Sequence, residues 1–334
     1  MMLRTIAISS MVLVLTVSSI MEAALSPQGA GAKEFTASID IMVKMAGEDS
    51  ADVERFFAAL GRSPSIKVDG SLFLPSTTSE AGAVVVLVSS GGESGDALTE
   101  SVYNDPQWRK LAETLHAPLL SVRIQGPAQL VVRDATTGSG QGLLMLLERL
   151  AEQSGHPELK DARTLLWGIS AAGGFATSFA AMEPQRTIGF VRYHSNQRDV
   201  PVDVNAVTKI PALLLAGEKD ETAGTEDAQQ LWRAGRESAA PWAFVIEPGA
   251  PHGSEEVLRK AGPLMTSWIE AIFHQRLNAD GKTLITVNDA SGWLGNSETR
   301  QITPAGSFSG SKTQASWLPD ETSAQGWRTL WGPK

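Results

Sequence analysis

Cysteine is absent from all 334 residues of the chain. This excludes disulfide bonds, thiol nucleophiles and every metal site built on thiolates. It leaves the compartment open, because a domain of this size does not depend on disulfides. Basic residues are also in the minority, with 28 Lys and Arg against 37 Asp and Glu and a net charge of -9. A chain with this balance lacks the electrostatic footprint of nucleic-acid or anionic-lipid binding, and we expect neither partner.

The apolar segment near the N-terminus is short. It occupies residues 6–17, after a single arginine, and small residues follow around Ala23 and Ala24. A charged start, a short apolar stretch and a small-x-small exit are typical of a signal peptide. The run is too short to span a bilayer comfortably, so no stable membrane anchor is expected. We expect cleavage of residues 1–24 and an exported mature protein, periplasmic or extracellular.

Aromatic residues are scarce at 6%, although nine of them are Trp. Four of the nine lie in the last segment, which is otherwise rich in Gly, Ser, Thr and Asn: Trp293, Trp317, Trp327 and Trp331. Residues 277–334 are too poor in apolar periodicity to fold alone. We expect this extension to lie across the preceding domain with its rings buried. The alternative is that one ring forms a wall of a substrate cleft.

The stretch from Trp317 to Glu321 predicts a helix start, with Pro319 in the first turn and acidic residues near the positive end. The short helix after it would present Trp327 and Trp331 on one face, because they are four residues apart.

Hydrophobic residues make up 42% of the chain, enough for a substantial core. Between residues 71 and 276 apolar runs alternate with helical patterns, after an N-terminal segment with the first strands at 25–70. The run at 83–88 shows no alternation, which indicates burial on both faces as in a parallel sheet between helices. We therefore predict an α/β fold with a doubly wound, mostly parallel sheet. The expected strands are 71–75, 83–88, 118–122, 163–167, 187–193, 211–215 and 243–246, and the expected helices 52–60, 108–115, 142–153, 171–182 and 255–276.

In such sheets the chemistry lies where strands end and helices begin. The strand at 163–167 is followed by the sequence GISAAGG and then by helix-forming residues. A serine on a sharp strand-to-helix turn has a strained backbone and needs small neighbours, which here are Gly168, Ala172 and Gly173. The turn exposes the hydroxyl of Ser170 at the positive end of the following helix, where a developing oxyanion is favoured.

This turn resembles the nucleophile elbow of the α/β-hydrolase superfamily, whose common pattern is G-x-S-x-G. Ala172 stands where the second glycine usually is and is small enough to fit. The resemblance covers roughly residues 72–276 and implies a nucleophile at Ser170. It also implies an acid in a G-x-x-D turn after a later strand and a histidine after the last strand.

The resemblance selects Asp220, in the GEKD sequence after the strand at 211–215, and His252, in the EPGAPHG sequence after the last strand. Glu218 and Glu221 are weaker candidates for the acid. A carboxylate at this place would accept the Nδ1 proton of the histidine and fix its tautomer. The chain order Ser, Asp, His is that of the α/β-hydrolases.

Two backbone donors are also implied for the oxyanion. The first is the N–H of Ala171, directly after the nucleophile. The second belongs to the glycine-rich segment after the strand at 83–88, where Gly91 or Gly92 is expected. Among the other histidines, His194 follows a strand and is a candidate for substrate contact. A solvated or core role is expected for the remaining three: His116, His156 and His274.

The short spacing between nucleophile and acid leaves no room for a helical cap. In this respect the chain resembles the lidless dienelactone hydrolase, acetyl esterase and polyhydroxybutyrate depolymerase branches, with Ser in place of the Cys of dienelactone hydrolases. We find no metal-ligand spacing, Walker loop or dinucleotide fingerprint, so neither a metal nor another cofactor is expected.

The leading hypothesis is an exported serine hydrolase that cleaves a small-molecule or polymeric carboxylic ester through an acyl-enzyme. The same triad acting on an amide or peptide is an alternative, and an inactive hydrolase-fold binding protein is another. Retention of Ser170, Asp220 and His252 argues against the inactive protein. The pattern indicates neither the substrate's identity nor an oligomeric state.

Overall fold

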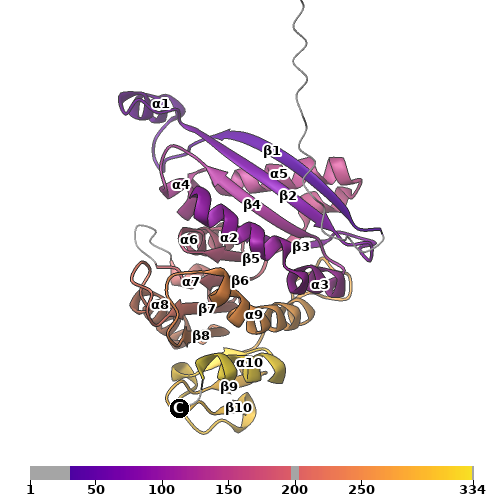
Figure 1. The fold of residues 1–334 in the computed structure, drawn as a ribbon, viewed down its shortest axis with the longest axis vertical. Helices are drawn as coiled ribbons and strands as arrows, with labels where there is room; N and C mark the ends of the chain where they lie inside the picture. Colours follow the sequence, from indigo (N-terminus) through magenta and orange to yellow (C-terminus); the bar gives the residue numbers. More distant parts are fainter. Residues whose placement is uncertain (1–30, 197–202, 333–334) are drawn as a thin grey trace, which may run out of the picture.

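The computed structural model describes residues 31–196 and 203–332, and its centre is an eight-stranded β-sheet (Figure 1). The predicted signal peptide, residues 1–24, lies outside the described residues. In chain order the strands of this sheet are β1 (Lys33–Met42), β2 (Ser65–Leu74), β3 (Ala83–Val88), β4 (Leu119–Gln125), β5 (Arg163–Ile169), β6 (Thr187–Tyr193), β7 (Ala212–Gly217) and β8 (Trp242–Glu247).

The spatial order of the strands is β1-β2-β4-β3-β5-β6-β7-β8. Strand β2 is antiparallel to β1 and β4, and every other pair is parallel. Every residue of β3 and β7 is buried, because helices cover the sheet on both sides. The predicted fold class, a doubly wound and mostly parallel α/β sheet, is confirmed.

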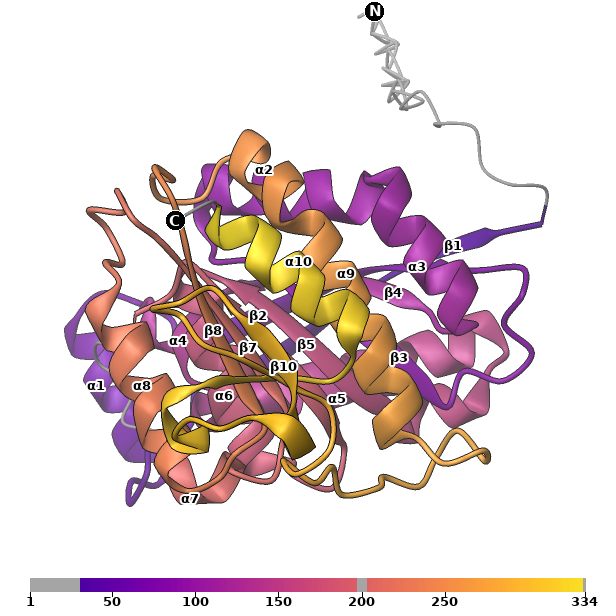
Figure 2. The ribbon, with the colours of Figure 1, turned by 90° about the horizontal axis from the view of Figure 1, so that it is seen from below.

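Two helix layers flank the sheet, each closing its own apolar core (Figures 1 and 2). One face carries α2 (Gly92–Asn104), α3 (Pro106–Leu115) and α9 (Glu255–Arg276). The core of the other face includes residues of α1 (Ser50–Ala59), α4 (Leu130–Arg133), α5 (Ser139–Ser154), α6 (Ala171–Met182), α7 (Val204–Val207) and α8 (Glu226–Glu237). No helix in the described residues is both long and apolar enough to cross a membrane.

Residues 25–70 were expected to hold the first strands, but no bounds were predicted for β1, and the boundary drawn between residues 70 and 71 falls inside β2, which starts at Ser65. The reason is that β1 is an edge strand whose residues are mostly exposed or half-buried, with Ile39 as its one buried member. Such a strand lacks the apolar run that marked its neighbours.

The glycine-rich segment after β3 is also shorter than expected. Helix α2 begins at Gly92, so residues 92–95 belong to its first turn and the loop is limited to residues 89–91. The change in direction is made at Gly91 and Gly92, whose φ angles of 79° and 73° favour glycine.

The C-terminal extension forms a small three-stranded sheet of order β10-β9-β11 and a final helix (Figure 2). These elements are β9 (Trp293–Gly295), β10 (Ile302–Pro304), β11 (Ser316–Leu318) and α10 (Glu321–Trp331). The predicted helix start was placed too early, because Trp317 and Leu318 pair with β9 as strand residues. The N-cap is Asp320, whose carboxylate accepts the backbone N–H of Ser323 at 2.7 Å, and Pro319 precedes it.

Three of the four Trp rings of the extension are buried, and Trp293 is half-buried. The extension covers the free edge of the large sheet at β8. The hydroxyl of Ser316 bonds both the backbone N–H and the carbonyl of Phe244, at 2.9 and 3.0 Å. The indole N–H of Trp327 donates to the same carbonyl at 2.7 Å. The extension therefore occupies the backbone groups of Phe244, which an uncovered edge strand would offer to another chain.

Candidate active site

The structure brings together the three side chains predicted to form a triad. Ser170, Asp220 and His252 lie in loops after β5, β7 and β8, at the carboxyl ends of parallel strands. The Oγ of Ser170 lies 3.0 Å from Nε2 of His252. The Nδ1 of His252 lies 2.8 Å from Oδ2 of Asp220. The geometry therefore provides an unbroken hydrogen-bonded path from the serine hydroxyl to a carboxylate.

Ser170 occupies a strained turn between β5 and α6. Its φ of 52° and ψ of -122° are rare for a residue with a side chain. A Cβ on Gly168 would collide with the backbone of Ala172, and a Cβ on Gly173 would collide with the side chain of Ser195. The turn is thus held by small neighbours on both sides. Ala172 itself is fully buried and fits.

Asp220 is held by backbone donors as well as by His252. Its Oδ1 accepts the N–H groups of Thr222 and Ala223 at 2.9 and 2.8 Å, and its side chain is fully buried. Burial alone would raise the pKa of Asp220. The hydrogen bonds from His252 and Ala223 outweigh burial and hold the pKa below the ordinary value of 3.8.

Neither alternative acid takes this place. Glu218 accepts the backbone N–H of Gly249 at 2.7 Å and is exposed, as is Glu221. Glu218 nevertheless helps to join the acid loop to the base loop, together with the backbone bond from Lys219 to the carbonyl of Ala250.

The predicted oxyanion donors lie at two helix N-termini. Ala171 is the first residue of α6 and Gly92 the first of α2. The N–H of Gly91 donates to Oγ of Ser89 at 3.0 Å, and that hydroxyl donates to Asp96 at 2.5 Å. This engagement favours Gly92 over Gly91 as the second donor.

His194, a candidate for substrate contact in the sequence, does not reach the surface. Its ring is fully buried behind Asp220, with Nδ1 3.5 Å from Oδ2 of Asp220 and Nε2 3.2 Å from Oε1 of Glu247. Glu247 was not among the site residues predicted from the sequence. The signal available was a carboxylate at the end of the otherwise apolar strand WAFVIE, where burial demands a partner.

The other histidines lie away from the triad. His116 ends α3, His156 bonds Glu158 at 2.9 Å, and His274 is exposed on α9. They keep the structural roles expected for them.

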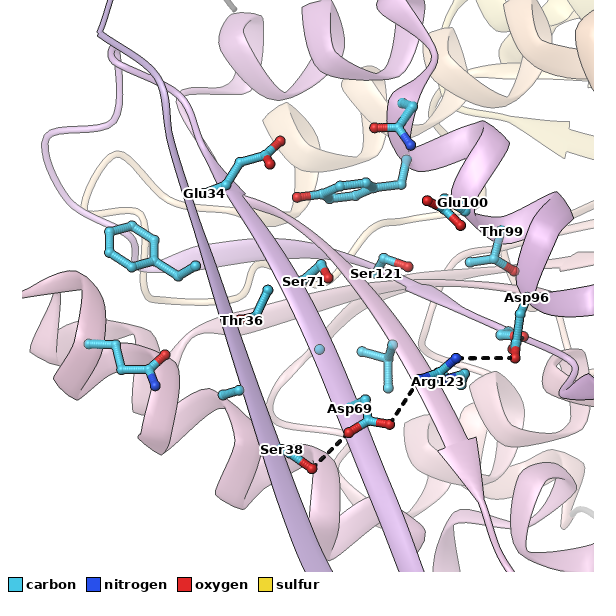
Figure 3. A pocket seen from close by; sticks show the side chains of 18 of the residues that line it. Glu34, Thr36, Ser38, Asp69, Ser71, Asp96, Thr99, Glu100, Ser121 and Arg123 are labelled. Atoms are coloured by element: carbon cyan, nitrogen blue, oxygen red, sulfur yellow. Dashed lines mark hydrogen bonds and ion pairs between the residues drawn. The ribbon is translucent and has the colours of Figure 1, made fainter. Parts of the chain in front are cut away.

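A groove of about 940 Å³ opens elsewhere, between β1, β2, β4 and α2 (Figure 3). An ion pair joins Asp69 to Arg123 across it, and Arg123 also lies 3.8 Å from Asp96. None of the triad residues lines this groove. The triad itself opens at the surface, with the His252 side chain 28% exposed.

Among the described residues, one set of acidic or histidine side chains has ligand atoms close enough to share a metal ion. It consists of His194, Asp220 and His252, whose atoms lie within 4.8 Å of one another. His252 is already hydrogen-bonded through both ring nitrogens, to Asp220 and to Ser170. Both nitrogens are therefore already engaged by side chains of the Ser-His-Asp cluster.

The strand order and the placement of Ser, Asp and His after β5, β7 and β8 define an α/β-hydrolase fold with a Ser-His-Asp triad geometry. No family model and no curated protein sequence matches the chain. Solved structures do resemble it.

Three of the similar structures show the levels of sequence identity, coverage and TM-score that these matches reach. A ferulic acid esterase shares 11% identity at a TM-score of 0.49, covering 72% of this chain and 99% of its own. The esterase domain of a Rhodothermus marinus protein shares 15% at 0.44, covering 71% and 98%. An acylaminoacyl peptidase from Pyrococcus horikoshii shares 12% at 0.42, covering 70% of this chain and 41% of its own. Similarities this low do not assign an activity.

Proposed function

We propose that the protein is a serine hydrolase that cleaves a carboxylic ester through an acyl-enzyme. The observation that carries the proposal is the pair of contacts made by His252, 3.0 Å to the Ser170 hydroxyl and 2.8 Å to Asp220. A histidine in this position can act as the base that activates the serine hydroxyl. A purely structural role would not require the histidine side chain to be partly exposed at the surface, as that of His252 is.

In the proposed reaction the Oγ of Ser170 attacks the ester carbonyl while Nε2 of His252 takes its proton. The oxyanion of the tetrahedral intermediate is stabilised by the N–H of Ala171 and by that of Gly92, each at the positive end of a helix. His252 then returns the proton to the leaving alcohol, and the acyl group stays on Ser170. Water, deprotonated by His252, releases the acid and restores the serine.

Asp220 accepts a hydrogen bond from Nδ1–H of His252 throughout. Its lowered pKa keeps it ionised while the imidazolium forms, so the positive charge is stabilised at the moment of attack.

Ser170 lies in an open site, which suits an ester substrate that remains partly in solvent when it binds. Among the described residues between the nucleophile and the acid, helix α7 is the one element besides α6, β6 and β7, so no helical cap covers the serine. A small or polymeric ester fits such a site. Cleavage of an amide by the same triad is the second candidate, because the geometry of the triad serves both reactions.

We also propose that the protein acts after export, in the periplasm or outside the cell. The support is the signal-peptide pattern in residues 1–24.

The proposal is tested by a panel of short and long acyl esters together with matched amides, assayed with and without a chelator. We expect hydrolysis of esters, no dependence on the chelator, and loss of nearly all activity in Ser170→Ala with the fold intact. Ser311→Ala, an exposed serine in the extension, is the control and should retain full activity. Faster cleavage of amides than of the matched esters would favour the second candidate, and full activity of Ser170→Ala would refute both.

A further inference from the structure

A second histidine and a second carboxylate continue the line of the triad into the core. His194 follows β6, Asp220 follows β7 and Glu247 ends β8, and these three strands are neighbours in the sheet. The three side chains are fully buried. The imidazole lies between the carboxylates, 3.5 Å from Asp220 and 3.2 Å from Glu247.

The fold is built around this ring. His194 has a φ of 46°, and its backbone N–H donates to the carbonyl of Leu215 at 2.9 Å. Its ring stacks on Tyr193 with centroids 4.3 Å apart. A Cβ on Gly217 would come within 2.8 Å of Cε1 of His194, so the glycine leaves room for the ring.

Three polar atoms of this cluster lack a hydrogen bond of good geometry: Nδ1 of His194, Oε2 of Glu247 and the hydroxyl of Tyr193, which interacts with Glu247 more loosely. Unpaired polar atoms are costly at complete burial, and a single proton decides how this cluster is satisfied. The groups that face His194 are Asp220, Glu247, Tyr193 and, at 6.3 Å between ring centroids, His252.

The possible protonation states can be compared. If His194 carried its one proton on Nε2, the lone pair of Nδ1 would face the ionised Asp220, and two buried carboxylates would share one neutral ring. If the proton were on Nδ1, the lone pair of Nε2 would face Oε1 of Glu247, which is repulsive unless that carboxyl is protonated. Both repulsions disappear when one further proton is held between Nε2 and Glu247. In that state Nδ1 carries a proton directed at Asp220.

We propose that His194, held by Glu247, is a positioning residue for the triad: its Nδ1–H faces Oδ2 of Asp220, and a proton shared with Glu247 keeps it there. The inference rests on the proposed function of the same triad. Oδ2 of Asp220 then lies between two imidazoles, while Oδ1 is held by the N–H groups of Thr222 and Ala223. The carboxylate cannot rotate away from His252.

The proton also has an electrostatic consequence. The pair of His194 and Glu247 is neutral overall, but its positive end is the nearer neighbour on the far side of Asp220 and weakens the attraction of that carboxylate for the proton on His252. The same positive neighbour acts to lower the pKa of Asp220, which agrees in direction with its shift.

The test uses a double variant, His194→Phe with Glu247→Leu. Phe keeps the stacked ring without N–H groups, and Leu leaves no unpaired carboxylate in the core. We expect the acid limb of the pH profile of kcat/KM to move to higher pH, because the variant removes the positive end of the pair, which is nearer to Asp220 than the carboxylate of Glu247 is. Since the pair is neutral overall, the shift should be smaller than the roughly one unit that an unpaired charge would cause. A folded double variant whose acid limb does not move would overturn the proposal.

Two further variants test whether the shift of the acid limb comes from His194 itself. His194→Asn places an amide nitrogen near the position of Nδ1 and should give a smaller shift of the acid limb than the double variant. His274→Gln changes an exposed histidine on α9 and should leave the profile unchanged. A shift of equal size in His274→Gln would show a general charge effect and contradict the assignment.

Nitrogen NMR of the intact protein tests the same claim without any variant having to fold, with the resonance assigned by its loss in His194→Phe or His194→Asn. A protonated Nδ1 on His194 at neutral pH supports the proposal, and a bare Nδ1 refutes it. Labelling of Ser170 by a fluorophosphonate separates the two levels. Normal labelling with an unmoved acid limb defeats only the role of His194, whereas absence of labelling defeats the proposed function itself.

Discussion

Asp220 is the residue on which the geometry of the site converges, because two histidines and two backbone N–H groups face its oxygens. Asp220→Asn should lower kcat by orders of magnitude, as an amide at this place favours the wrong tautomer of His252. Glu218→Gln is the matched control and should lose little, because Glu218 is exposed and contacts only the loop at Gly249. Steady-state kinetics of both variants check this. The reverse ranking would move the acid to Glu218.

Asp220 also links stability to pH. Its pKa is lowered in the folded chain. The ionised form therefore stabilises the fold at pH values above the pKa of an unfolded aspartate, about 3.9. This contribution is lost as the pH falls through the folded pKa.

The corresponding experiment is urea unfolding of the parent protein and of Asp220→Asn between pH 6 and pH 3. The free energy of unfolding of the parent should fall toward that of the variant at the acidic end, since the variant lacks this titration. A difference between the two proteins that stays constant across the range would contradict the assigned direction of the shift.

The sharp turn between β5 and α6 depends on glycine, because a side chain at Gly168 would collide with the neighbouring backbone. Gly168→Ala would place a methyl group against the backbone of Ala172. We expect a loss of about 1–3 kcal/mol in the free energy of unfolding and a drop in kcat as Ser170 is displaced. Ala172→Gly is the control, and it should keep activity at a cost of at most about 1 kcal/mol. An active and fully stable Gly168→Ala would show that the turn is not set by this contact.

The elements that could be predicted from sequence are those with a strong local pattern. The bounds of β3, β6, α6 and α9 were predicted as the structure has them, because continuous apolar runs and long helical periodicity identify buried strands and helices. The bounds of β1 could not be predicted and the strands of the extension were missed, since these strands are short or half-exposed and are fixed by tertiary pairing. Helix α2 was not predicted at all, because its first residues are glycine-rich and favoured a loop.

The candidate site likewise contains residues that could be predicted from local sequence patterns and residues that could not. Ser170, Asp220 and His252 follow recognisable strand ends, so their meeting could be expected from chain order. The contact of His194 with Glu247 joins positions 53 residues apart and depends on the register of three strands. Only the folded structure reveals such a pairing.

At the scale of the whole molecule, the extension closes the sheet at β8 and packs on α9 (Figure 2). The guanidinium of Arg236 links α8 to the extension by donating hydrogen bonds to the carbonyls of Ala315 and Lys312, at 2.9 and 2.7 Å. Burial lowers the pKa of Arg236 to about 10, so the guanidinium still carries its charge at neutral pH.

Removing residues after Leu277 should therefore destabilise the protein and expose an edge strand to aggregation. Trp327→Ala should cost about 3–5 kcal/mol in the free energy of unfolding, because the ring is fully buried. Trp293→Ala, at a half-buried ring, should cost less. Denaturant unfolding measures the loss, and the acyl-chain preference of the surviving folded enzyme should not change. A stable Trp327→Ala enzyme with altered acyl preference would place the ring in the substrate cleft instead.

The central claim is that Ser170 forms a covalent intermediate with the help of His252. Its most direct test is to treat the purified protein with a fluorophosphonate and map the adduct by peptide mass spectrometry, with His252→Ala as a parallel sample. We predict one adduct per chain, on Ser170, and its near absence in His252→Ala because the serine then lacks its base. An adduct on any other serine, or no adduct on the folded parent protein, would contradict the account.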